Sequence, residues 1–443
     1  MTQISPVIRR LLALRPSTYL ANVALLAGST ATSQSIGFLA TLILSRIYAP
    51  DEFGILTVFT SLSGPLMLVV TGQFDQAIPL AKDDEKRARL LEFTLLLVMT
   101  CAFLVGIIVL TFPNSIANAL GVPVLSKYLW LLPFSLLGAG FFTSLSMWSL
   151  QKKAFSVVAA STLQQTVVRV SAQGLLGGAG LKPAGLMLGE VLGSFGGVGR
   201  LMWKTWSSDR HLFQTSAKRN WLEIAAEYRR FPLLAMPSAV LNIMANSVPQ
   251  ILLASMFGTA GAGLFGMSQR LTAVPVSLIG NSLGQVFYAD LASRRHEIGH
   301  HRKRFREMSM ILAGIGVVGA LLLLLAPYWA GPLLGRRWYE AGAVIAAMAP
   351  MLLGRIVVAP VARTYFVYGK QHVLLMLDLF RLLLIVVMFG VAYWNQWSYT
   401  TVVWSFSLCM FFVYAIHWLA ISQIMRLEQA DTAPLASGEA SKK

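Results

Sequence analysis

The sequence contains few charged residues. Asp, Glu, Lys and Arg make up only 12% of the chain, whereas they make up about a quarter of a typical soluble protein. Hydrophobic residues make up 56% of the 443 positions. This composition excludes an ordinary soluble domain and indicates a protein that lies in a lipid bilayer.

The chain also lacks the motifs of several common functional sites. Its two cysteines, Cys101 and Cys409, lie in apolar segments, so neither a disulfide framework nor a thiolate metal site is expected. No P-loop, HExxH motif, CxxC pair or nucleophile elbow occurs. His296, His300 and His301 are better explained by a basic helix against anionic lipid headgroups than by a metal site. We therefore predict no metal and no cofactor, and we expect no ATP-driven transport by this chain alone.

Acidic residues are scarcer than basic ones, with 19 against 36 and a formal net charge of +17. In a soluble protein this excess would indicate nucleic-acid binding, but in a membrane protein it first reports topology. The basic residues gather in alternate segments, whereas the opposite loops hold only Lys182, Arg336 and Arg337. The basic segments are 9–15, 82–89, 152–153, 204–230, 294–306, 370 and 426–443. The positive-inside rule then predicts that both termini are cytoplasmic, and we expect no nucleic-acid partner.

Stretches of roughly twenty apolar residues recur along the whole chain, and each is long enough to cross a hydrocarbon core of about 30 Å as a helix. Uninterrupted apolar runs exclude a barrel. We predict an all-α integral membrane protein with about twelve transmembrane helices. The expected spans are 20–47, 53–74, 91–112, 124–148, 156–176, 183–206, 231–256, 260–290, 307–327, 341–367, 372–393 and 398–424.

The longest internal connection, 207–230, divides the chain into two halves of six spans each. We expect an N-terminal six-helix bundle over 1–206, a cytoplasmic linker over 207–230 and a C-terminal six-helix bundle over 231–424. Residues 425–443 are expected to form a flexible cytoplasmic tail.

The two halves resemble each other at the first helical hairpin. Residues 40–56 can be laid on residues 249–265, which pairs Gly54 with Gly263. Repeats of six spans keep the same orientation in the membrane. The repeat therefore predicts a pseudo-twofold axis along the membrane normal, with a cavity between the halves.

Span six carries glycines at four-residue spacing: Gly185, Gly189, Gly193 and Gly197. This spacing leaves one face of the helix as bare backbone. We expect a neighbouring helix to pack closely against that face.

Four arginines, Arg169, Arg270, Arg355 and Arg381, are expected near mid-membrane from their positions along the spans. Arg363 lies two turns closer to the cytoplasm, on roughly the same face as Arg355. A central arginine costs about 2.5–3.5 kcal/mol on insertion scales, so these side chains are expected to face the protein interior.

Two arrangements would satisfy these arginines. The first is internal ion pairing, for which Asp378 and Arg381 have the i, i+3 spacing of a helical pair. Glu190 is the only other clear acid at that depth, so pairing cannot neutralise the whole set. The second is a water-filled cationic cavity between the halves, which we favour. Such a cavity selects an anion, and guanidinium groups suit a phosphate or diphosphate.

The segments LSRIYAPDEFGIL at 44–56 and QFDQAIPLAKDDEKR at 73–87 resemble the opening of bacterial polysaccharide flippases of the O-antigen and capsule type. These proteins belong to the multidrug/oligosaccharidyl-lipid/polysaccharide exporter superfamily. The resemblance implies a V-shaped pair of six-helix bundles around a central cavity. It also implies a structural role at helix ends for the matching residues Arg46, Tyr48, Gly54, Asp75 and Ala77.

The resemblance further implies a transporter, not an enzyme. The expected activity is transfer of an undecaprenyl-diphosphate-linked oligosaccharide from the cytoplasmic to the periplasmic leaflet of a bacterial inner membrane, by alternating access. The expected pathways are O-antigen, capsule or exopolysaccharide biosynthesis, and proton or sodium coupling is implied. The expected partners are membrane lipids, a polysaccharide polymerase and its co-polymerase.

The sequence and the resemblance together give a hypothesis for the site. Five arginines are expected to line the cationic lumen and bind substrate: Arg169, Arg270, Arg355, Arg363 and Arg381. Glu190 and Asp378 are candidates for ion coupling. One alternative is a multidrug or cation antiporter of the same superfamily, which should carry a surplus of buried acids. A second is a membrane-embedded glycan polymerase or ligase, which should carry a long periplasmic loop.

Overall fold

The computed structural model describes residues 18–214, 221–293 and 298–439, and helices make up the described chain without any strand. The predicted all-α class is confirmed. In the first half the helices are α2 (Thr18–Ile47), α3 (Pro50–Thr71), η1 (Phe74–Leu80), α4 (Asp84–Thr111), α5 (Pro113–Ala119), η2 (Pro123–Lys127), η3 (Leu129–Leu131), α6 (Leu132–Gln151), α7 (Phe155–Gly178), α8 (Ala184–Phe195) and α9 (Val198–Gln214).

The second half follows a short helix, α10, that lies within the predicted linker. Lys86 of α4 donates to Glu227 of α10 at 3.1 Å, which ties this helix to the first half. The helices of the linker and the second half are α10 (Trp221–Glu227), η4 (Phe231–Ala235), α11 (Met236–Ser293), α12 (Ile298–Leu324), α13 (Ala326–Leu334), η5 (Arg336–Trp338), α14 (Ala341–Ala347), α15 (Ala349–Val361), α16 (Thr364–Val367), α17 (Gln371–Trp394) and α18 (Tyr399–Glu439).

Helix α11 folds back on itself at Gly258, whose φ of 74° is non-helical. Gln250 donates to Gln269, 19 positions later, although 19 residues of straight helix would span about 28 Å. The hydrogen bond therefore requires two antiparallel arms, 236–257 and 259–293. Glycine suits this position because it adopts positive φ without steric cost.

Seven helices of the described chain are long and apolar enough to cross a membrane, or eight if the bent pair α14 and α15 forms one span. This result supports a multi-pass membrane protein. One of the seven covers both arms of α11. Two long helices, α2 and α7, fall outside the set, and both carry many polar residues. The layout of twelve spans stays a prediction.

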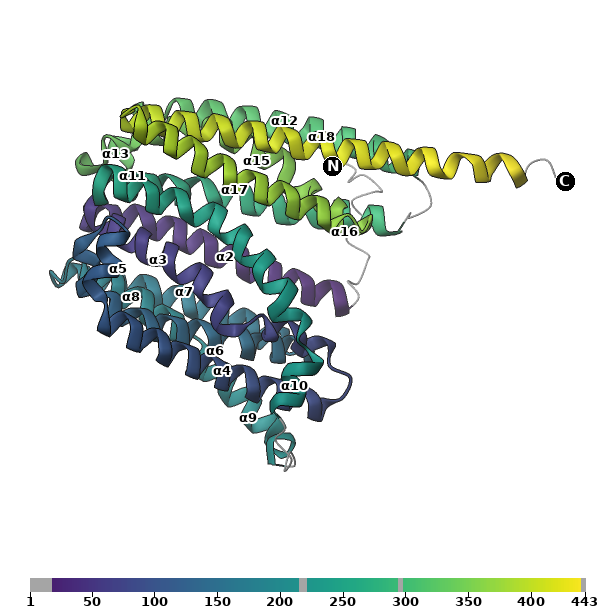
Figure 1. The fold of residues 1–443 in the computed structure, drawn as a ribbon, viewed down its shortest axis with the longest axis horizontal. Coiled ribbons are helices and arrows are strands. Elements are labelled where there is room, and N and C mark those ends of the chain that lie inside the picture. Colours follow the sequence, from purple (N-terminus) through teal and green to yellow (C-terminus); the bar gives the residue numbers. More distant parts are fainter. Residues whose placement is uncertain (1–17, 215–220, 294–297, 440–443) are drawn as a thin grey trace, which may run out of the picture.

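Among the described residues, the shared core of the two halves lies at one end of the molecule. The largest apolar cluster joins Tyr48 and Phe53 of the first half to Phe265 and Trp338 of the second. The two other clusters are separate: one surrounds Trp148 of the first half and the other surrounds Tyr365 of the second. Figure 1 shows the corresponding V, in which two groups of helices meet at the α5 and α13 end and diverge toward the α10 and α16 end.

The contacts between α3 and the second arm of α11 are reciprocal. A Cβ built on Gly54 would overlap the carbonyl oxygen of Thr259, and one built on Gly263 would overlap the carbonyl oxygen of Pro50. The sequence alignment that pairs Gly54 with Gly263 also pairs Pro50 with Thr259. A twofold axis makes each contact occur twice with the roles exchanged, so this crossing has the symmetry that the repeat predicts.

Candidate functional site

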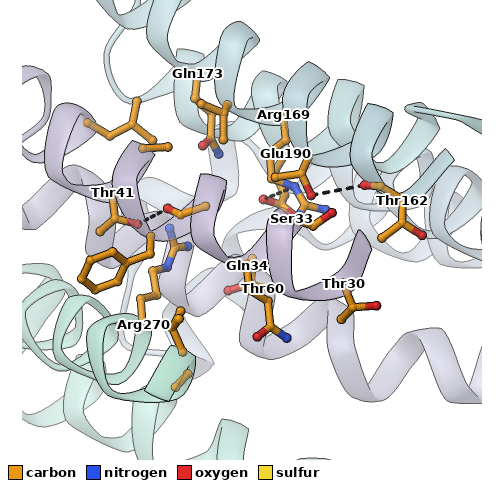
Figure 2. A pocket seen from close by; sticks show the side chains of 18 residues that line it. Thr30, Ser33, Gln34, Thr41, Thr60, Thr162, Arg169, Gln173, Glu190 and Arg270 are labelled. Atoms are coloured by element: carbon orange, nitrogen blue, oxygen red, sulfur yellow. Dashed lines mark hydrogen bonds and ion pairs between the residues drawn. The ribbon is translucent and has the colours of Figure 1, made fainter. Parts of the chain in front are cut away.

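A cavity of about 490 Å³ lies between the two halves, where α2, α7 and α8 of the first half face the second arm of α11. Two helices contribute most of its lining, and Figure 2 shows their polar side chains around it. The positions on α2 include Thr30, Ser33, Gln34, Gly37 and Thr41. The positions on α7 are Thr162, Thr166, Arg169, Val170 and Gln173. These spacings of three, four and seven residues place each set on one helix face.

Arg169 and Glu190 form an ion pair at the wall of this cavity. Arg169 Nε lies 3.3 Å from Glu190 Oε2, and their side chains are 35% and 17% exposed. The close approach of α7 and α8 depends on glycine, because a Cβ on Gly189 or Gly193 would overlap Gln173 or Arg169. The close packing predicted for the glycine face is confirmed, and it brings the two charges together.

Arg270 enters the same cavity from α11, opposite the ion pair (Figure 2). Its guanidinium carbon lies 5.4 Å from the ring centroid of Phe53, a distance at which a cation is attracted to the ring face. Among the described residues, Arg270 has no carboxylate within ion-pair distance. Since Glu190 already compensates Arg169, the lining carries one uncompensated positive charge.

Arg381 lies outside the lining of this cavity, in a buried network with Asp378. Arg381 Nη2 lies 3.3 Å from Asp378 Oδ1 and donates to the Asn242 carbonyl at 3.2 Å. The Asn242 side chain donates to Asp378 Oδ2 at 3.0 Å. The ion pair that the i, i+3 spacing allowed is therefore formed, and it also ties α17 to the first arm of α11.

We expect Asp378→Asn to destabilise the protein by about 3–5 kcal/mol, because it leaves the guanidinium of Arg381 buried without its carboxylate. Thermal unfolding in detergent measures this loss. The double variant Asp378→Asn, Arg381→Leu removes both charges and is expected to recover most of the stability. A single variant as stable as the wild type would show that the pair does not hold α17 in place.

Arg355 and Arg363 also lie outside the lining of the cavity. Both are half-buried, and neither has an ion-pair partner among the described residues. Ala359, one turn after Arg355, lies against Gly280 of α11. The structure thus brings Arg169, Arg270 and Glu190 to one site and leaves Arg355, Arg363 and Arg381 outside it.

Sequence reasoning missed the polar residues that lie between the two halves. Gln34 of α2 accepts a hydrogen bond from Ser277 of α11, and Ser61 of α3 donates to Gln250. Both contacts cross between the halves. The signal was present in residues 30–41, where Ser, Thr and Gln recur at helical spacing inside an otherwise apolar span.

The halves are hydrogen-bonded together at the α5 and α13 end, which we call the closed end. Arg46 Nη2 donates to the carbonyls of Pro332 and Leu333 at 2.6 and 3.0 Å. Trp338 Nε1 donates to the carbonyls of Ser45 and Tyr48 at 2.9 and 3.2 Å. These bonds satisfy backbone groups at helix ends, so Arg46 and Tyr48 have structural contacts here.

Solved structures with this fold include membrane transporters and a flippase. An inward-facing multidrug resistance transporter of the MATE family, in the MOP superfamily, has a TM-score of 0.68 at 15% identity, over 90% of this chain and 95% of that chain. The lipid II flippase MurJ, in an inward closed conformation, has a TM-score of 0.71 at 11% identity, over 90% and 86%. A eukaryotic MATE transporter has a TM-score of 0.58 at 12% identity, over 93% and 98%. At these identities the similarity shows the fold.

A family model described as polysaccharide biosynthesis protein matches residues 43–343. The match covers more than half of the chain, so the chain belongs to this family. No curated protein matches it. The predicted polysaccharide family is confirmed, and the chain shares its fold with solved membrane transporters and flippases.

Proposed function

We propose that this chain is a flippase that transfers an undecaprenyl-diphosphate-linked oligosaccharide from the cytoplasmic to the periplasmic leaflet of a bacterial inner membrane. Both termini then lie in the cytoplasm, and the cavity opens away from the closed end. The diphosphate binds in the cavity, the glycan occupies water-filled space and the polyprenyl tail stays in lipid between the bundles. The product serves a polysaccharide polymerase and its co-polymerase in O-antigen, capsule or exopolysaccharide synthesis.

The observation that carries this proposal is the uncompensated guanidinium of Arg270 in a cavity between the halves. A guanidinium presents a planar fork of donors that matches two phosphate oxygens. Arg169 lies in the same lining, and a substrate phosphate can compete with Glu190 for it. Transport outward is favoured electrically, because each negative charge gains about 2.3 kcal/mol per 100 mV of an inside-negative potential.

The charge of the cavity disfavours a cation antiporter. The described lining holds two guanidinium groups, those of Arg169 and Arg270, and one carboxylate, that of Glu190, so a cationic substrate would meet a net positive charge. Arg355 and Arg363 remain candidates for substrate contact, since neither has an ion-pair partner in the described chain. Arg381 would have to leave Asp378 to bind substrate.

The proposal is tested with the purified protein in proteoliposomes that contain a fluorescent undecaprenyl-diphosphate oligosaccharide. We expect the protein to move this lipid between leaflets, with little movement of the undecaprenyl-monophosphate analogue. A membrane-impermeant quencher reports the leaflet. Export of a cationic dye without movement of the diphosphate lipid would overturn the proposal in favour of an antiporter.

The same assay tests ion coupling. We propose that a proton or sodium ion binds Glu190 or Asp378, and that a gradient of that ion accelerates transfer. Glu190→Gln is expected to remove the acceleration, because the ion competes with Arg169 for this carboxylate. The rate of transfer measured without an ion gradient is expected to persist. Asp378→Asn is compared with it at equal amounts of folded protein, because this variant is expected to be less stable. If neither variant changes the response to pH and sodium gradients, the coupling proposal fails.

A further inference from the structure

A second cavity, of about 380 Å³, lies on the second half, where α12 and α18 pack together. Figure 1 shows these two helices side by side on the outer side of their bundle. We call it the α12–α18 groove. Its lining consists of Arg302, Lys303, Phe305, Arg306, Trp418, Ser422 and Arg426. Neither α12 nor α18 contributes to the lining of the cavity between the halves.

Four cations of this groove have no counter-charge. Arg302, Lys303, Arg306 and Arg426 are exposed, and no described carboxylate lies within ion-pair distance of any of them. Arg304 differs, because it lies on the same helix but pairs with Glu307 at 3.3 Å and does not line the groove. Four like charges around one hollow repel one another, and an anion placed between them would remove that cost.

The floor of the groove is rigid. The rings of Phe305 and Trp418 are stacked, with centroids 5.5 Å apart and planes 28° apart. Trp418 Nε1 donates to Ser309 Oγ at 3.0 Å, and Phe305 is 3% exposed. The basic side chains therefore surround a floor that is already ordered. The hydroxyl of Ser422 adds a neutral donor beside them.

The groove adjoins apolar surface. One turn beyond Arg306 along α12, Met310 and Ile311 are 59% and 57% exposed. On α18, Leu419 is 54% exposed, one turn before Gln423 and two turns before Arg426. Exposed apolar side chains on a membrane-spanning helix face hydrocarbon. The basic hollow thus lies where headgroups meet acyl chains.

We propose that the α12–α18 groove binds the headgroup of an anionic phospholipid, with its acyl chains along the apolar faces of α12 and α18. Basic hollows between transmembrane helices are suited to such headgroups. Four unpaired cations favour a lipid with two phosphates over one with a single phosphate. The adjoining apolar surface favours a lipid over a free phosphate ion. The site lies outside the transport cavity, so it does not rest on the proposed function.

The test measures lipid retained by the full-length protein, by native mass spectrometry after exchange into detergent with defined lipid. We expect cardiolipin to be retained more strongly than phosphatidylglycerol, and phosphatidylcholine not at all. The double variant Arg306→Gln, Arg426→Gln is expected to bind cardiolipin about tenfold to thirtyfold more weakly, since each cation near the surface contributes about 1 kcal/mol. The matched control is Arg210→Gln, Arg304→Gln, which removes two exposed charges outside the groove.

Three outcomes would overturn the proposal. Equal weakening in both double variants would mean that general surface charge holds the lipid. Unchanged binding in Arg306→Gln, Arg426→Gln would mean that lipid binds elsewhere. Displacement of cardiolipin by millimolar inorganic pyrophosphate would identify a site for a soluble anion. A circular dichroism melt that matches the wild type shows that the variants are folded.

Discussion

Transport is expected to fall by about a hundredfold or more when Arg270 is replaced by glutamine, because a phosphate group would lose two charge-assisted hydrogen bonds, together worth about 3–6 kcal/mol. Arg270 carries the one charge of the described cavity lining that no carboxylate compensates. Glutamine keeps a similar volume and a polar end, so the cavity itself is expected to persist. Initial rates of diphosphate-lipid transfer in proteoliposomes measure the effect.

Two control variants make this result specific. Arg270→Lys keeps the charge but loses the planar fork, so an intermediate rate is expected. Arg200→Gln changes an exposed arginine of α9 outside the cavity, and its rate is expected to match the wild type. Normal transfer by Arg270→Gln, at equal protein in the membrane, would remove the cavity as the diphosphate site.

Much of the fold follows from the sequence because lipid constrains it strongly. Long apolar runs require helices, and the same constraint makes an interior location for the mid-span arginines predictable. Arg169 and Arg270 do meet at one cavity. The alignment that pairs Gly54 with Gly263 also locates the crossing of α3 and α11, since a close symmetric contact needs glycine on both sides.

The remaining features depend on contacts that spacing alone does not determine. Arg381 could face a lumen or pair with Asp378, and Asn242, which joins that network, lies 136 positions from Asp378. Arg355 is the one polar residue of α15. The residue pattern therefore does not indicate which face of this helix points to the protein interior. The polar side chains of α2 and α7 line the cavity. They also lower the hydropathy of these two helices, so neither helix is among the candidate membrane spans.

The crossing of α3 and α11 yields the second large effect. We expect Gly54→Leu to prevent stable assembly, because even its Cβ would overlap the carbonyl oxygen of Thr259 and neither backbone can yield without separating the helices. Overpacking a well-filled interior typically costs about 1–3 kcal/mol and more where backbone must move. The expected readouts are a large loss of folded protein in detergent-solubilised membranes and a lowered unfolding temperature. Because the contact is reciprocal, Gly263→Leu is expected to have the same effect through the carbonyl oxygen of Pro50.

The matched control is Gly174→Leu on α7, where no atom lies within 4 Å of a built Cβ. This variant adds the same side chain to a helix, so near-normal folding is expected. Gly54→Ala distinguishes the effect of a large side chain from that of the close backbone contact, because it adds only the Cβ. This variant is still expected to destabilise the protein. If Gly54→Ala folds as well as Gly174→Ala, then α3 and α11 can separate at little cost, and the crossing does not hold the two halves together. If Gly54→Ala is destabilised, as the geometry requires, this reciprocal contact holds α3 against α11 in the conformation described here.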